Sequence, residues 1–145
     1  MYDVTVSSPL SVRFDDQVLE RLRRRAAATP GLTPSGLAQR LVDEGLRMVE
    51  HPGVVFKEGP SGRRAALAYG PDVWEVVLCV RQVDERGEAA LEAAADIFAL
   101  PPERLRAALH YYAAHPQEID AEIDQAETES ARAEDAWEAE RRLLA

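Results

Sequence analysis

Ser11 and Arg13 are the first candidates for chemistry, because they alternate with apolar residues over positions 10–14. Leu10, Val12 and Phe14 take the other positions, and this period of two predicts a strand with one buried face. Ser11 and Arg13 would then point outward. An arginine can bind guanine through two hydrogen bonds, and a serine can bond to base edges. The pattern therefore predicts contacts with DNA bases, and the alternative is a solvent-exposed strand face without a ligand.

A second candidate site lies where a helix is predicted to begin, at residues 33–35. Thr33 is placed to cap this helix, and Pro34 suits its first position. The unpaired N–H groups of a helix N-terminus carry partial positive charge, which suits a phosphate. We expect Thr33 and Ser35 to hold a DNA backbone there. Plain capping by Thr33 is the alternative, and the two are compatible.

The end of the chain carries candidate contacts for a protein partner. From residue 119 onward, mostly apolar or small residues recur at alternating spacings of four and three, which predicts a thin stripe along a helix. The other faces are mostly acidic, so this helix would be marginal alone but could dock in an apolar groove. The predicted partner contacts are Ile119, Ile123, Arg132, Trp137, Arg141 and Arg142. The alternatives are a disordered acidic end and a helix packed on a second copy of the chain.

A cluster of histidines and tyrosines is assigned to packing rather than to a metal or catalytic site. His110 and His115 lie five residues apart, off one face of a helix, and no carboxylate completes a known ligand spacing. Tyr111, Tyr112 and Trp74 are expected in a core or an interface. No constellation suggests catalysis, so we expect a protein that is not an enzyme and uses no cofactor or metal.

The elements that position these residues predict a mainly α protein with short strands. After the strand at residues 10–14, helices are expected at residues 16–28 and 34–50. A turn at residues 58–62 predicts a hairpin of two short strands. The remaining chain predicts helices at residues 72–83, 88–95, 101–114 and 116–142.

Breaks between these elements divide the chain into three predicted parts. Residues 1–50 form the strand and two helices. Residues 51–115 form a small α+β or helical domain that ends in a pair resembling a helix-turn-helix, for which we expect a structural or partner-binding role. Residues 116–145 form an acidic amphipathic helical tail.

Residues 10–48 together resemble the ribbon-helix-helix family of DNA-binding dimers. A unit this small cannot bury its apolar face alone. The resemblance implies a homodimer held by the N-terminal strands and helices, with Ser11 and Arg13 reading operator DNA in the major groove. The family's third outward residue corresponds to Pro9, which cannot hydrogen-bond to a base, so the expected readout is narrower.

A second resemblance covers residues 51–123 and points to domain-of-unknown-function family 433. It is carried by the segments at residues 62–65, 72–76 and 107–120, the last containing Tyr-Tyr and His-Pro-x-Glu-Ile-Asp. That family is associated with antitoxins of bacterial toxin–antitoxin pairs. The resemblance implies a cognate toxin as partner, of the PIN-type ribonuclease group, held by the tail.

Composition fits this organisation, because the acidity is concentrated in the tail. The net charge of −9 is unusual for a DNA-binding protein, but residues 1–50 carry seven Arg and seven acidic residues. Residues 116–145 carry three Arg and ten acidic residues. A single cysteine, Cys79, excludes an internal disulfide, and no apolar run is long enough to span a membrane. We therefore expect a cytoplasmic protein without membrane contact, and the resemblance to antitoxins implies a bacterial one.

The two resemblances together imply a type II antitoxin that neutralises a PIN-type ribonuclease and represses its own operon. The alternative is a stand-alone ribbon-helix-helix regulator whose second domain binds an effector or a protein. A buried pocket lined by Tyr69, Trp74 and Tyr111 would favour that alternative.

Overall fold

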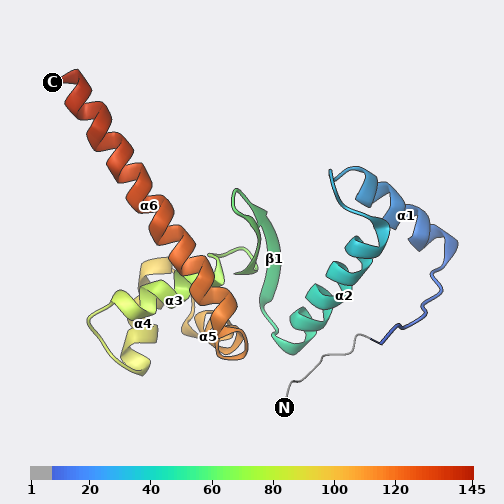
Figure 1. Ribbon diagram of the computed structural model, residues 1–145. Coiled ribbons are helices and arrows are strands. Elements are labelled where there is room, and N and C mark those ends of the chain that lie inside the picture. The colour runs from blue at the N-terminus through green and yellow to red at the C-terminus, as the bar shows by residue number, and fades with distance from the viewer. Residues whose placement is uncertain (1–7) are drawn as a thin grey trace, which may run out of the picture. The chain divides into compact units, whose positions relative to one another are not determined.

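The computed structural model describes residues 8–145, and this part of the chain is mainly helical. It contains six helices and one antiparallel pair of strands (Figure 1). The elements are α1 (Asp16–Ala27), α2 (Pro34–Glu50), β1 (Val54–Gly59), β2 (Gly62–Leu67), α3 (Val73–Gln82), α4 (Glu88–Phe98), α5 (Pro102–Ala114) and α6 (Pro116–Leu144). The prediction of a mainly α protein with short strands is confirmed at this level.

The chain divides into two compact units, Met1–Asp43 and Glu44–Ala145, which we call unit 1 and unit 2. The division falls inside α2 rather than at the predicted boundary after residue 50. The prediction of a separate tail from residue 116 is also corrected, because the first turns of α6 belong to the core of unit 2.

Unit 1 contains a helical hairpin whose ends follow the predicted caps. The Asp15 carboxylate accepts a hydrogen bond from the N–H of Gln17 at 2.9 Å, and Thr33 Oγ1 accepts one from the N–H of Gly36 at 3.0 Å. Gly31, at φ +77°, makes the turn between the two helices. Residues 8–15 form no strand within the chain, so the strand predicted at residues 10–14 is absent from the single chain.

Unit 2 begins with the predicted hairpin of β1 and β2. The strands pair antiparallel from Val54 opposite Leu67 to Gly59 opposite Gly62, and Gly62, at φ +108°, closes the turn. The inner residues of β2 are fully buried, since the hairpin packs on α3 and α5. This confirms the strands predicted on either side of residues 58–62.

Four helices complete unit 2 around one hydrophobic core. A capping box of Asp72 and Glu75 starts α3, and Ala99, in the left-handed region, ends α4. The core is built from β1 and β2 and from one face each of α3, α4, α5 and the start of α6. Its largest fully buried side chains include Tyr111, Leu67, Leu105 and Ile119. Within residues 8–145 no helix is long and apolar enough to cross a membrane.

The aromatic residues Tyr111, Trp74 and Tyr69 differ in their burial. Tyr111 is fully buried and Trp74 packs against the core, which confirms their structural role. Tyr69 is completely exposed, so the buried pocket lined by Tyr69, Trp74 and Tyr111 that would have favoured a stand-alone regulator does not form. Tyr69 lies in the loop between β2 and α3, outside the core.

Tyr2, Val4 and Val6 alternate in the sequence as in a strand, but they lie outside the described residues.

Candidate DNA and partner interfaces

Ser11 and Arg13 both lie in the exposed extended segment before α1. The apolar residues that alternate with them are exposed as well, with Leu10 at 86% and Val12 at 59%. A lone chain therefore leaves both faces of this segment in water. Exposure of the apolar face costs free energy, because each such side chain would gain about 1.5–3 kcal/mol on full burial.

This segment borders an open groove of about 580 Å³ on unit 1. Phe14 contributes to its wall beside Leu10 and Val12, and the opposite side comes from α1 and α2. The residues lining it are Ser8, Leu10, Val12, Phe14, Leu19, Leu22, Pro34, Ser35, Ala38, Gln39 and Val42. Ser35, predicted to hold phosphate, thus lies on the same groove as the segment that carries Ser11 and Arg13.

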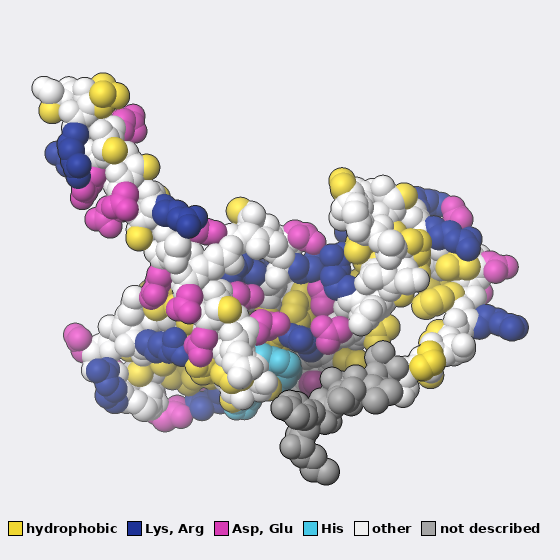
Figure 2. All heavy atoms as spheres, viewed as in Figure 1, with side chains coloured by type: hydrophobic (Ala, Val, Ile, Leu, Met, Phe, Trp, Pro, Cys, Tyr) yellow, Lys and Arg dark blue, Asp and Glu magenta, His cyan; other side chains and the backbone are white. Residues whose placement is uncertain are grey.

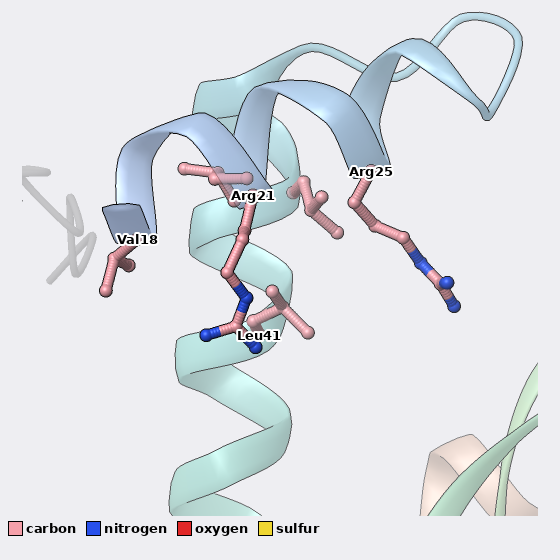
Figure 3. Close-up of a pocket in the computed structure, with 6 residues that line it drawn as sticks. Val18, Arg21, Arg25 and Leu41 are labelled. Carbon is pink, nitrogen blue, oxygen red and sulfur yellow. The ribbon is translucent and has the colours of Figure 1, made fainter. Parts of the chain in front are cut away.

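A second groove, of about 450 Å³, lies between α1 and α2. Val18, Arg21 and Arg25 extend from one side of α1, and Leu41 comes from α2 (Figure 3). Leu22 and Leu37 complete the lining. The groove is therefore apolar at its base, with two guanidinium groups beside it.

The two grooves are present because unit 1 does not bury most of its own apolar residues. Among the described apolar residues of unit 1, only Ala26 and Leu37 are buried. Val18, Leu41 and Val42 remain substantially exposed, and Figure 2 shows apolar side chains at the surface of this part of the chain. Such exposure is characteristic of a surface that another polypeptide covers.

The start of α2 behaves as a capped helix end. The Thr33 hydroxyl is occupied by the N–H of Gly36, which confirms capping. Thr33 and Ser35 are both exposed, so their backbone is open to a ligand. A role in holding phosphate stays a prediction.

The distal half of α6, residues 127–145, consists entirely of exposed residues. It extends away from the other helices of unit 2 in Figure 1. Trp137 is 55% exposed, and the Arg141 guanidinium lies 4.7 Å from the centre of its ring. Arg142 pairs with Glu138 at 3.1 Å, and Arg132 is exposed. These four predicted partner contacts are accessible.

Ile119 and Ile123 must be removed from the predicted partner contacts. They are 0% and 4% exposed, because they pack against the core of unit 2. They belong to the same helical stripe as Trp137, so one part of the stripe is buried in the core and the other part is exposed. Its first two turns anchor α6 in the core, and the turns from residue 127 onward are exposed, with Glu129 accepting a hydrogen bond from Ser61 Oγ at 3.2 Å.

A polar network at the base of α6 was not expected from the sequence. Arg47 donates to the Tyr111 hydroxyl at 2.7 Å and to Glu118 Oε1 at 2.8 Å, while Tyr111 donates to Glu118 Oε2 at 2.5 Å. Burial, reinforced by Glu118, raises the pKa of Tyr111 well above its usual value. The network connects α2, α5 and α6, and it gives Tyr111 a structural function.

A second unexpected group is the pair of Glu122 and Arg64. Their closest atoms, Glu122 Oε2 and Arg64 Nη1, are 3.8 Å apart, and neither of these buried atoms has a hydrogen-bond partner. Burial raises the pKa of Glu122 to about 7, against the opposing effect of the Arg64 charge. This carboxyl therefore titrates near neutral pH.

The histidines do not form a site with carboxylates. His51 and His115 instead contact the Tyr111 ring, with centroid distances of 5.1 and 4.6 Å. Within residues 8–145, no group of three or more His, Cys, Asp and Glu side chains is arranged to hold a metal ion.

The environments of three residues, Arg47, Glu122 and Tyr69, could hardly be predicted from the sequence. Arg47 and Glu122 lie on amphipathic helices where a charge ordinarily faces water, and their partners are far away along the chain. The pattern at residues 64–69 predicts a strand, whereas β2 ends at Leu67 and Tyr69 lies in an exposed turn.

Comparison with family models, with curated proteins and with solved structures gives no significant match for this chain. The two family resemblances thus neither gain nor lose support from these comparisons.

Proposed function

We propose that the protein is a homodimeric DNA-binding repressor that also serves as the antitoxin of a bacterial toxin–antitoxin pair. The observation that carries the DNA-binding part is the exposed apolar face of residues 10–14 beside a groove lined by α1 and α2. Pairing this segment with its copy in a second chain would bury Leu10, Val12 and Phe14. It would also place Ser11 and Arg13 of both chains on one outward face.

The DNA-binding surface of this dimer has a defined composition. Two copies of Arg13 supply bidentate contacts to guanine, and two copies of Ser11 bond to base edges. The N-termini of both α2 helices, at Thr33 and Ser35, flank the ribbon and hold the phosphate backbone. Repression follows from occupancy of an operator, so no catalytic step and no cofactor are involved.

The DNA-binding proposal is tested by selecting duplexes from a random-sequence library with the full chain and then titrating the selected duplex. Arg13→Ala is expected to weaken binding about tenfold or more, since a bidentate base contact contributes about 1–3 kcal/mol. Arg23→Ala is the matched control, because Arg23 is exposed on α1 outside the ribbon, and it should change affinity by about threefold or less. Failure to enrich any duplex would contradict the proposal.

The observation that supports the antitoxin role is the exposed distal half of α6. An amphipathic helix end with an exposed aromatic residue is suited to a groove on another protein. Trp137 would serve as the anchor, and Arg132, Arg141 and Arg142 would reach acidic groups of a PIN-type ribonuclease.

This part is tested by copurification from the native host. A stoichiometric ribonuclease that is inhibited by the full chain, and is released when residues 127–145 are deleted, is the expected result. A partner that stays bound after this deletion would exclude the helix as its docking site. A chain that purifies alone while still repressing its promoter would favour the stand-alone regulator.

A further inference from the structure

The loop of residues 68–71, between β2 and α3, presents Tyr69 to solvent in an unusual backbone conformation. Tyr69 is 100% exposed and has φ +52°, in the left-handed region that bulky residues rarely adopt. Glycine takes this conformation without steric cost, whereas a tyrosine there is strained by about 1 kcal/mol or more. An aromatic side chain kept fully in water at a strained position indicates a role outside the fold.

The surrounding structure holds this loop firmly. The N–H of Leu67 donates to the Pro71 carbonyl at 2.9 Å, and the N–H of Gly70 donates to the Leu67 carbonyl at 3.1 Å. Lys57 Nζ donates to the Gly70 carbonyl at 2.9 Å, and the Arg104 guanidinium donates to the Ala68 carbonyl. The Tyr69 ring is therefore projected from a rigid base, which lowers the entropy cost of binding through it.

The two cations that hold the loop also give it a positive charge. Neither Lys57 nor Arg104 forms a salt bridge with any residue in the described range 8–145. Both are bonded only to the carbonyls that flank Tyr69. An exposed aromatic ring between two uncompensated cations is complementary to an acidic surface with apolar side chains.

We propose that, while no toxin occupies α6, the Tyr69 loop docks on the acidic distal half of α6 in a second copy of the chain. Residues 124–140 contain seven acidic residues and one arginine, and residues 127–145 are all exposed. Carboxylates there pair with Lys57 and Arg104, while Tyr69 lies against apolar side chains of the helix such as Trp137. The contact is head-to-tail, because one copy supplies the loop and the other supplies the helix.

Other occupants fit the loop less well. Two Tyr69 loops facing each other would bring four cations together without a carboxylate. A nucleic acid would meet the two cations, but the acidic α6 of the same unit would repel its phosphates. The contact does not depend on dimerisation through residues 10–14, since loop and helix both belong to unit 2.

A mixing experiment with two complementary variants tests the contact. Tyr69→Gly removes the ring and the strain but keeps α6, whereas deletion of residues 127–145 removes the helix end but keeps the loop. Sedimentation velocity of the full chain should show an association step that produces larger species than either variant forms. Tyr69→Gly should lower the affinity of this step about tenfold or more. At a concentration where the full chain associates, each variant alone should show little of this step, and a mixture of the two should restore it in part.

Further variants separate the charge contribution from the fold. Lys57→Gln should weaken the step, and high salt should weaken it too. Arg86→Gln is the matched control, because Arg86 also donates only to backbone carbonyls in a different loop, and it should leave the step unchanged. Thermal unfolding confirms that each variant is folded.

Three results would overturn the proposal. The first is a full chain that shows no additional association at high protein concentration. The second is a mixture of the two variants that behaves as the sum of its parts. The third is a Tyr69→Gly variant that loses affinity for DNA while its self-association is unchanged, which would assign the loop to nucleic acid.

Discussion

At the scale of single residues, Glu122 has the most unusual environment in unit 2. Its carboxyl is largely buried beside Arg64, yet the two groups share no hydrogen bond. Burial raises its pKa to about 7 from an ordinary value of 4.5. The protonated side chain is therefore favoured in the folded protein. This contribution to stability is fully present below about pH 4.5 and is lost as the pH rises through 7.

Replacing Glu122 by Gln should remove that pH dependence. Glu122→Gln is expected to raise the free energy of unfolding at pH 8 by roughly 1–2 kcal/mol and to change it little at pH 4.5, since one pKa unit corresponds to about 1.4 kcal/mol. Denaturant unfolding at several pH values measures this. Glu127→Gln, an exposed change on the same helix, is the control. A variant that is less stable than the wild type at pH 8 would show that the charge pair with Arg64 outweighs the burial of the carboxylate.

At the scale of elements, α6 combines a start anchored in the core with an exposed end. Ile119 and Ile123 pack into the core, whereas no residue from 127 onward is buried. The same helical spacing of apolar residues runs through both halves, so spacing alone could not distinguish them. Only the contacts of α3 and α5 with the first turns decide where burial ends.

Substitutions in the two halves of α6 should therefore differ sharply. Ile119→Ala is expected to lower the free energy of unfolding by about 2–5 kcal/mol, because it removes a fully buried side chain. Leu143→Ala, at the exposed end, should change it by about 0.5 kcal/mol or less. Chemical denaturation followed by circular dichroism compares the two. Similar losses for both variants would contradict the division of the helix.

The elements were the most predictable part of this molecule. Caps at Asp15 and Thr33, the turn at residues 58–62 and the prolines at residues 101 and 116 are local signals, and the structure has helix or strand boundaries at or within a residue or two of each. The strand at residues 10–14 behaves differently, since its hydrogen-bond partner would come from another chain. Contacts distant in sequence, such as Arg47 with Glu118, left no local signal and could not be predicted.

At the scale of the whole molecule, the proposed DNA-binding dimer depends on how unit 1 buries its apolar face. The candidate DNA contacts followed from alternation in the sequence, and the structure adds that the apolar half of that alternation is uncovered. The charge distribution agrees with separate tasks for the two ends, because residues 1–50 are balanced and residues 116–145 are strongly acidic. Each end presents an exposed surface that is suited to a different partner.

Two neighbouring residues of the extended segment provide a matched pair of substitutions for testing whether this segment forms the dimer. Val12 and Arg13 point to opposite faces of a strand, so their substitutions should separate dimerisation from DNA contact. Val12→Lys would place a charge in the ribbon's buried face and should dissociate the dimer, because an unpaired buried charge is strongly unfavourable. Arg13→Ala should leave the dimer intact.

The most direct measurement is the mass in solution by sedimentation equilibrium, made in the Tyr69→Gly background so that association through the Tyr69 loop does not contribute. The account predicts twice the chain mass of 16.0 kDa for this protein and for its Arg13→Ala variant, and the mass of a single chain for its Val12→Lys variant. A single-chain mass without any substitution in residues 10–14, or a Val12→Lys variant that remains a dimer, would contradict a dimer formed through this segment.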